Sequence, residues 1–250
     1  MKTFLILLNL IFFSATKGQD INSIIKEAVQ YEASMNDVKA ISKYKEALNL
    51  QPANIYLICK CSELSSMIGG RYKSDHKKMT DLYSAAKVYA DLALKLNPKY
   101  SEANFVMSLV VGRTAMQKGG KEKIDAVKDI KKYAELAILY DPENYKAWHV
   151  LGKWFYEFSI LNFFQRAAVK LFYGPLPEAS LNDAISAYEK SKKLNPALLL
   201  NYLELAKAYK KNSEEHKAKL LLKTLLTLPL KTEDDPSIKA EGTVLLKKWS

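Results

Sequence analysis

The chain has 250 residues, of which 48% are hydrophobic and 26% charged, with nine glycines and two cysteines. This composition excludes collagen-like, disulfide-framework and disordered proteins, and a mean hydropathy of −0.18 argues against a polytopic membrane protein. The 38 Lys and Arg residues outnumber 27 Asp and Glu residues, which gives a net charge of +11. Only Arg71, Arg113 and Arg166 are arginines, so the excess is almost all lysine, which favours solvated helix surfaces over specific nucleic-acid recognition.

Residues 1–18 have the pattern of a secretory signal peptide. Lys2 precedes an apolar run from Phe4 to Phe13, and small residues follow at Ser14 and Ala15. An apolar run of about ten residues is too short for a helix to cross roughly 30 Å of hydrocarbon. We therefore expect cleavage between Ala15 and Gly18 and export of residues 19–250 as one periplasmic or secreted domain. An uncleaved membrane anchor is the alternative.

Four prolines divide the rest of the chain at similar sequence positions. Pro52, Pro98, Pro142 and Pro196 each follow an apolar stretch that reads as the last turn of a helix. Small or aromatic residues recur eight residues before them, at Tyr44, Ala90, Ala134 and Tyr188, and four residues earlier still, at Ala40, Ala86, Ile130 and Ala184. Small residues at these offsets would let one helix pack closely on its partner. The pattern predicts helix pairs over about 21–50, 54–97, 100–140, 144–195 and 198–229.

A final helix is predicted after Asp235, which we expect to be its N-cap, with Pro236 as its first residue. Ser180 and Asp183 have the spacing of a capping box before the second helix of the fourth pair. No stretch has the two-residue period of a strand, and no domain linker is visible. The predicted class is all-α.

This arrangement resembles the tetratricopeptide repeat. The family positions are matched best by Trp148, Leu151-Gly152, Phe155, Ala184, Tyr188, Ser191 and Pro196. The resemblance implies an α-solenoid in which stacked helix pairs share one continuous core. The prolines are 46, 44 and 54 residues apart, longer than the repeat length of about 34, so we expect insertions between the two helices of each unit.

Two of these expected insertions contain paired glycines, Gly69-Gly70 and Gly119-Gly120. A phosphate-binding loop would need a G-x-x-x-x-G-K-[ST] string, which is absent, so flexible turns are expected. Cys59 and Cys61 are two residues apart in a predicted helix, where their side chains diverge and cannot form a disulfide. We expect both to be buried and free.

The stretch from Gly152 to Pro177 is apolar nearly all round, which predicts a helix buried on several sides. Four stretches in this part of the chain resemble the regulator of microtubule dynamics family and related bacterial secreted repeat proteins. They are the Leu151-Gly152-x-Trp154 opening, the runs from Phe164 to Ala167 and from Leu171 to Pro177, and the later helix from Leu203 to Tyr209. The resemblance implies a repeat protein with no established catalytic residues. Eukaryotic members are linked to microtubules, spindle poles and organelle contacts.

No pattern indicates an enzyme, a metal site or a cofactor. The histidines His76, His149 and His216 are far apart, and no H-E-x-x-H, G-x-S-x-G or paired-carboxylate motif occurs. A protein-binding scaffold would use the groove lined by the first helices. The candidate groove residues are Arg113, His149, Lys153, Tyr156, Lys207 and Lys210, with Cys59, Glu63, Phe105, Leu109 and Leu203 beside them.

The basic groove residues would suit an acidic peptide. The alternative is a microtubule-associated regulator whose lysine pairs bind acidic tubulin tails by charge attraction. These pairs are Lys77-Lys78, Lys131-Lys132, Lys192-Lys193 and Lys210-Lys211. Anionic lipid headgroups are a further alternative, and we expect no specific nucleic acid and no transmembrane segment in the mature chain.

Overall fold

The computed structural model describes residues 15–115, 119–162, 165–167, 170–171 and 179–249, and of residues 15–20 and Gly120 only the backbone. All regular elements in these ranges are helices, as predicted. They are α1 (Ala15–Ala33), α2 (Asp37–Leu50), α3 (Ile55–Arg71), α4 (His76–Leu96), α5 (Ser101–Ala115), α6 (Gly120–Tyr140), α7 (Tyr145–Ser159), α9 (Leu181–Leu194), α10 (Leu199–Lys211), α11 (Glu215–Thr227) and α12 (Asp235–Trp249). Residues 1–14 of the predicted signal peptide lie outside the described residues.

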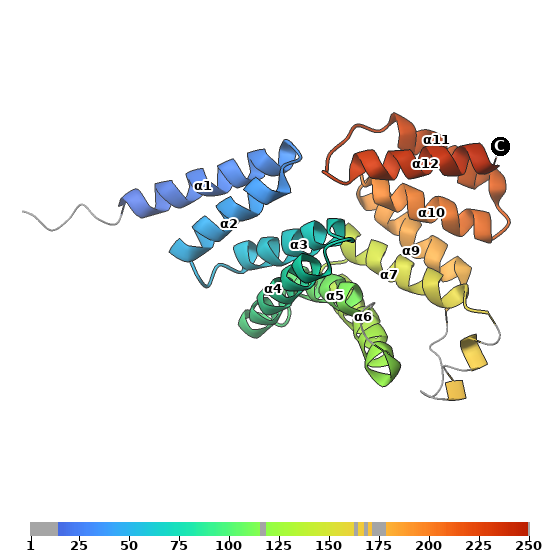
Figure 1. The fold of residues 1–250 in the computed structure, drawn as a ribbon, viewed down its shortest axis with the longest axis horizontal. Helices are drawn as coiled ribbons and strands as arrows, with labels where there is room; N and C mark the ends of the chain where they lie inside the picture. The colour runs from blue at the N-terminus through green and yellow to red at the C-terminus, as the bar shows by residue number, and fades with distance from the viewer. Residues whose placement is uncertain (1–14, 116–118, 163–164, 168–169, 172–178, 250) are drawn as a thin grey trace, which may run out of the picture.

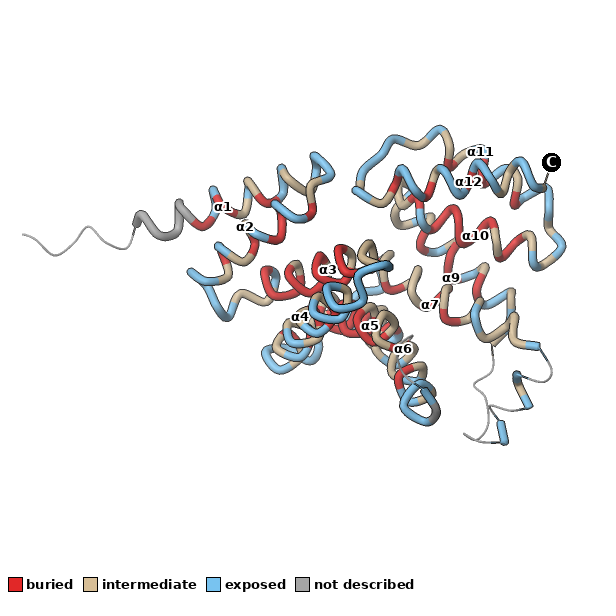
Figure 2. The backbone as a smooth tube through the Cα atoms, in the orientation of Figure 1, coloured by how far each residue is buried: buried red, intermediate tan, exposed pale blue. Residues whose placement is uncertain are grey.

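Successive helix pairs stack into an arc. It runs from α1 and α2 through α3–α7 to α9–α12, and the first and last helices approach each other across the open side (Figure 1). Buried residues lie on the helix faces that meet a neighbour (Figure 2). They form three apolar clusters that follow one another along the arc, in α1–α3, in α3–α7 and in α7–α12. This continuous core is the solenoid that the sequence predicts.

Four helices end just before the prolines, because the residue that precedes each proline leaves helical geometry. A proline pushes the preceding residue out of helical geometry, and Asn97 and Asp141 both have extended backbones. Their N–H groups still donate to Ala93 and Ala137, which completes the last turn. The predicted packing positions are also confirmed, since the residues eight before the prolines, Tyr44, Ala90, Ala134 and Tyr188, are fully buried.

The extra length of the units is accommodated in two ways. In α3–α4 and α5–α6 the helices themselves are long, 15 to 21 residues, and the connections between them are short. The prediction of a flexible turn at Gly69-Gly70 is wrong, because both glycines lie inside α3. Gly119 does precede α6 as its N-cap. A long connection between paired helices occurs in the fourth unit, between Ser159 and Leu181.

The buried helix expected from Gly152 to Pro177 is shorter than predicted, because α7 ends at Ser159. Arg166 explains this ending, since its guanidinium donates to the carbonyls of Phe158, Ser159 and Leu161. An arginine at a helix C-terminus satisfies carbonyls that have no partner in the helix. Residues 163–164, 168–169 and 172–178 lie outside the described residues.

Asp235 does not cap α12 as expected. It is the first helical residue, and the carbonyl of Asp234 accepts the first helical N–H bonds, from Ser237 and Ile238. The buried carboxylate of Asp235 instead accepts from the backbone N–H groups of Lys231 and Thr232 and from the Thr232 hydroxyl. It therefore fixes the connector that leads into α12.

The capping box is confirmed and gives a first prediction. Ser180 Oγ accepts from Asp183 N at 3.1 Å, and Asp183 Oδ2 accepts from Ser180 N at 3.0 Å. Replacing Ser180 by alanine should lower the free energy of unfolding by about 1 kcal/mol, because an N–H of the first turn of α9 loses its acceptor. Urea denaturation measures this loss. Ser180→Asp, which retains an acceptor, should recover most of it, and equal stabilities of all three proteins would contradict the assignment.

Candidate functional site on the inner face

Ion pairs connect the first helices of successive units along one side of the arc, which we call the inner face. Lys60 of α3 binds Glu32 of α1, and Lys153 of α7 binds Glu204 of α10. The face is therefore built by α1, α3, α5, α7, α10 and α12, as expected for a solenoid groove. These long polar side chains are held between neighbouring units, so their arrangement depends on how the units stack.

Three of the six predicted groove residues, Lys153, Tyr156 and Lys207, lie around Glu204. Its carboxylate accepts from Lys153 Nζ at 2.7 Å and from Lys207 Nζ at 2.8 Å, and Lys153 lies 5.7 Å from the ring centroid of Tyr156. Lys207 also binds Glu241 of α12. Burial alone would raise the pKa of Glu204, but the two lysines outweigh it and lower this pKa. Glu204 is therefore ionised and pairs with two of the lysines that were expected to suit an acidic peptide.

His149 lies beside this cluster and is neutral. Burial lowers its pKa, and its Nδ1 lies 3.0 Å from Asn201 Oδ1. The amide nitrogen of Asn201 donates to the carbonyl of Tyr188. Since Asn201 offers its oxygen to the ring, Nδ1 carries the proton and Nε2 is the acceptor. His149 can thus offer a hydrogen-bond acceptor but no charge near pH 7.

Lys146 is the centre of a second network, which sequence reasoning missed. Its ammonium binds Glu63 of α3 at 3.1 Å and Glu102 of α5, and lies 4.5 Å from the ring centroid of Phe105. Burial would raise the pKa of Glu63, but Lys146 and Lys60 outweigh it and lower this pKa. The pKa of Glu102 is raised by its burial, and the Glu63 charge adds to this effect. The partly buried ammonium of Lys146 thus joins three helices.

A pocket of about 280 Å³ opens next to this network, between the N-terminal ends of α3, α5 and α7. It is lined by Tyr56, Cys59, Lys60, Tyr100, Ser101, Glu102, Asp141, Asn144 and Lys146. Its walls combine two tyrosine rings with charges of both signs. Such a pocket can take one side chain of a bound peptide.

The remaining candidates lie in different surroundings. Lys210 is paired with Glu215 at 2.5 Å, towards α11. Arg113 faces Gly70 of α3, and its buried Nε has no hydrogen-bond partner in the structure. Cys59, Phe105 and Leu203 are 1–4% exposed and belong to the core, and Cys59 also borders the pocket. Both cysteines are free and buried, as predicted.

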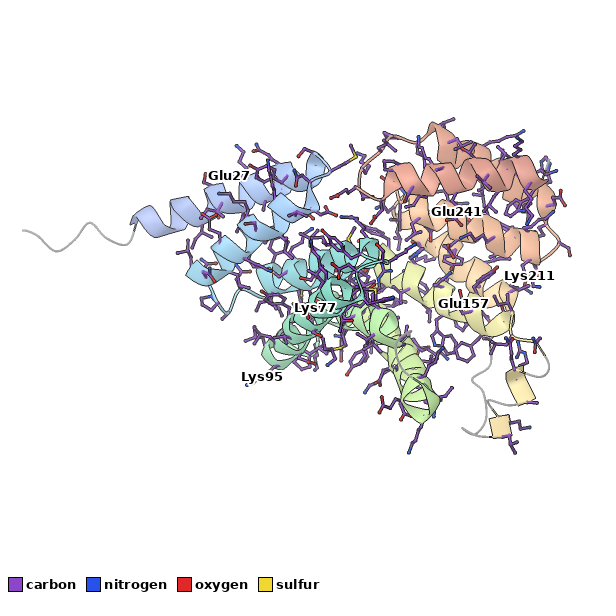
Figure 3. All side chains as sticks on the ribbon, in the orientation of Figure 1. Glu27, Lys77, Lys95, Glu157, Lys211 and Glu241 are labelled. Carbon is purple, nitrogen blue, oxygen red and sulfur yellow. The ribbon has the colours of Figure 1, made fainter. Side chains whose placement is uncertain are left out.

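The inner-face networks carry more acid than base. They join six glutamates to four lysines, so the net charge of these ten residues is −2. The residues are Glu32, Glu63, Glu102, Glu157, Glu204 and Glu241 with Lys60, Lys146, Lys153 and Lys207. The outer helices α2, α4, α6, α9 and α11 each contain more lysines than acids. Figure 3 labels Lys77 and Lys95 on α4 and Glu241 on α12. The inner helices α3, α7, α10 and α12 also contain more basic than acidic residues, so the lysine excess of the chain is spread over both sides of the arc.

Lys146, Glu102 and Glu204 belong to the inner-face networks but were not predicted, and they differ in whether a sequence pattern indicates their role. Lys146 lies seven residues before Lys153, so the two share one face of α7, and this spacing was an available signal. Glu102 offered no comparable signal, because Lys146 lies 44 residues away. Glu204 has a local partner in Lys207, but its contact with Lys153 spans 51 residues.

Two further features bear on function. Among the described residues, no three His, Cys, Asp or Glu side chains are grouped so that they could hold a metal ion. No helix in the described part of the chain combines the length and hydrophobicity that crossing a membrane requires.

Comparison with known proteins identifies relatives of the whole solenoid. The family model described as regulator of microtubule dynamics protein 1-3 matches residues 24–250. The regulator of microtubule dynamics protein 1 of Bos taurus is 24% identical over 95% of this chain and 74% of its own length. The Caenorhabditis elegans protein of that name is 25% identical over 78% of this chain and 84% of its own length. The Pongo abelii protein is 28% identical, but the chain spans only 56% of it.

Solved structures with a similar fold are tetratricopeptide-repeat proteins. A thermophilic protein of this class from Thermus thermophilus has a TM-score of 0.65, with 13% identity over 90% of this chain and 99% of that chain. The structure of Pseudomonas aeruginosa pilF has a TM-score of 0.52, with 14% identity over 93% of each chain. At these identities the likeness concerns the fold alone.

Proposed function

Because the chain belongs to the regulator of microtubule dynamics family and folds as a tetratricopeptide-repeat solenoid, we propose that it is a non-enzymatic scaffold that binds a protein partner on its inner face. The observation that carries this proposal is the organisation of that face. Charged side chains from five or more helices are held in position by ion pairs before any partner binds. A surface that is already ordered loses less conformational entropy on binding.

The proposed partner is a peptide segment with charges of both signs. Lys153, Lys207 and Lys210 have carboxylates beside them, so an acidic peptide would have to replace these contacts. Among the described residues Arg113 has no ion pair, unlike the three candidate lysines, and we propose that it binds a carboxylate of the partner. A basic or aromatic side chain of the same peptide would enter the pocket beside Glu102.

Selection of peptides from a random display library on the immobilised full chain tests this function. Selected peptides should bind Arg113→Ala and Lys153→Ala at least about fivefold more weakly, since each variant removes a charge from the contact surface. The matched outer-face variants Lys77→Ala and Lys95→Ala should bind as the parent does. Binding that depends on the outer lysines and not on the inner ones would contradict the proposal.

A microtubule-associated regulator is the second candidate, favoured by the family and by the lysine excess on every outer helix. In this case the outer face would bind acidic tubulin tails. Co-sedimentation with microtubules should then fall steeply between about 50 mM and about 300 mM NaCl, because exposed charges are screened. Reversal of Lys77 and Lys95 to glutamate should reduce pelleting at low salt, and Arg113→Ala should not. Absence of pelleting at low salt would remove this candidate.

Export is proposed from residues 1–18, with a membrane anchor as the alternative. Mass spectrometry of the mature N-terminus from the natural source distinguishes the two, because cleavage between Ala15 and Gly18 removes the apolar run. A chain that retains Met1 in a membrane fraction would contradict cleavage. Cleavage and export would also remove the protein from cytosolic microtubules, so this measurement bears on the second candidate.

A further inference from the structure

One arginine joins the two ends of the arc. Arg71, the last residue of α3, binds Asp37 at the start of α2, with Nη2 2.5 Å from Asp37 Oδ2. On its other side it binds Asp234 through Nε at 2.7 Å and Nη2 at 3.0 Å, and Glu233 through Nη1 at 3.1 Å. Glu233 also accepts from the backbone N–H of Asp37 at 3.0 Å. We call these four residues the Arg71 cluster.

The cluster connects parts of the fold that share no apolar core. The buried residues of α1–α3 and those of α10–α12 belong to separate hydrophobic clusters with no common member. No other ion pair among the described residues joins the first three helices to the last three. The two ends are therefore held by charge, and breaking this contact exposes little apolar surface.

The charge balance and the connector also favour reversible opening. Three carboxylates share one guanidinium, so Asp37 repels Glu233 and Asp234 once Arg71 is removed. Glu233 and Asp234 belong to the non-helical connector 228–234, and their side chains are 36% and 35% exposed. The Asp37 side chain is 6% exposed and that of Arg71 22%, so salt screens the contacts of Arg71 with Glu233 and Asp234 more than its contact with Asp37. The contact can break without unfolding a helix.

We propose that the Arg71 cluster is a latch that closes the arc into a ring and restricts lateral entry of a peptide to the inner face. With the latch closed, a partner reaches the inner face only along the axis of the ring. When the latch opens, the α10–α12 end moves away from α1–α3, and the two ends that approach each other in Figure 1 separate. This regulation concerns the inner face and so rests on the proposed function.

The distance between the two ends tests the latch in the full chain. Spin labels are placed at Ser42→Cys in α2 and Val244→Cys in α12, both at exposed positions. Cys59 and Cys61 are buried, which raises the pKa of each thiol to about 12 and protects them from labelling. Arg71→Ala should shift the pulsed electron paramagnetic resonance distance upward by about 5 Å or more, the scale of hinged movements.

Two further variants separate opening from unfolding. Glu233→Gln with Asp234→Asn retains Arg71 and should give the same shift, and Lys87→Ala, which removes the exposed pair with Asp91, should give none. About 1 M NaCl should lengthen the distance in the parent. An unchanged distance in both latch variants, with helical circular dichroism preserved, would overturn the proposal.

A kinetic measurement links the latch to binding. A peptide selected as described above should associate several-fold faster with the two latch variants than with the parent. Equal rates despite a longer distance would overturn the gating of the inner face while leaving the proposed function intact. If no peptide binds the inner face, the proposed function fails, and the distance measurement still decides whether the arc opens.

Discussion

Replacing Gly152 by leucine is expected to lower the free energy of unfolding by about 3 kcal/mol, at the upper end of what overpacking costs. Gly152 lies in α7 directly against the ring of Tyr188 in α9, which is fully buried. A Cβ atom at residue 152 would stand 2.7 Å from Tyr188 Cδ1 and 2.9 Å from Cε1. The ring cannot move away without displacing its own neighbours, so the two helices must separate.

Thermal melts and urea denaturation of Gly152→Leu measure this effect, and Gly152→Ala should show a smaller loss in the same direction. The matched control is Gly112→Ala in α5, where the nearest atom to a new Cβ is 3.8 Å away. An alanine there gains helix propensity without a clash, so it should be neutral or stabilising by up to about 1 kcal/mol. Equal stability of Gly152→Leu and the parent would refute the close contact.

The two glycine–tyrosine contacts show what the sequence could predict. Gly152 was identified because it lies in a Leu-Gly pair with the repeat spacing, and Tyr188 lies at a fixed offset from Pro196. Gly69 makes the same contact with Tyr83, where a Cβ would stand 2.8 Å from Cε1. The paired glycines and the lysines that follow them predict a turn at this position, although Gly69 lies inside α3. Both pairs join the first and second helix of one unit, so a comparison between the units was the missing step.

The fold was predictable because its signals are local. Each proline fixes the end of a helix through the residue before it, and small residues at constant offsets fix the packing face. The inner-face networks were not predictable, because they depend on which charges meet across units. The sequence contains 35 lysines. The seven-residue spacing places Lys146 on the same helix face as Lys153, but it does not show that Lys146 joins three helices. The Arg71 contact with Asp234 spans 163 residues and gives no sequence signal at all.

Replacing Lys146 by alanine is expected to be the other strongly destabilising change, by about 3–5 kcal/mol, because it leaves two carboxylates facing each other without their cation. The side chains of Lys146, Glu63 and Glu102 are 22%, 13% and 25% exposed. The alkyl stem also loses its packing beside Phe105. Lys87→Ala, which breaks an exposed pair four residues apart in α4, should cost at most about 0.5 kcal/mol and serves as the control.

The dependence on pH separates lost charge from lost packing. In the parent the pKa of Glu63 is lowered from its ordinary value of 4.5, so the ionised carboxylate stabilises the fold at pH values above 4.5. This contribution disappears as the pH falls through the folded pKa. In the variant the lowering effect of Lys146 is lost, while burial, the repulsion between the two glutamates and the opposing effect of Lys60 remain. We therefore expect both pKa values to be higher than in the folded parent, so that the folded variant binds protons more readily than the folded parent does. The destabilisation should therefore shrink when urea unfolding is repeated at about pH 5 instead of about pH 7. Adding Glu102→Gln to Lys146→Ala should recover part of the lost stability at pH 7, because it removes one of the two carboxylates. If the loss of stability is equal at both pH values and Glu102→Gln does not reduce it, Lys146 acts through packing alone.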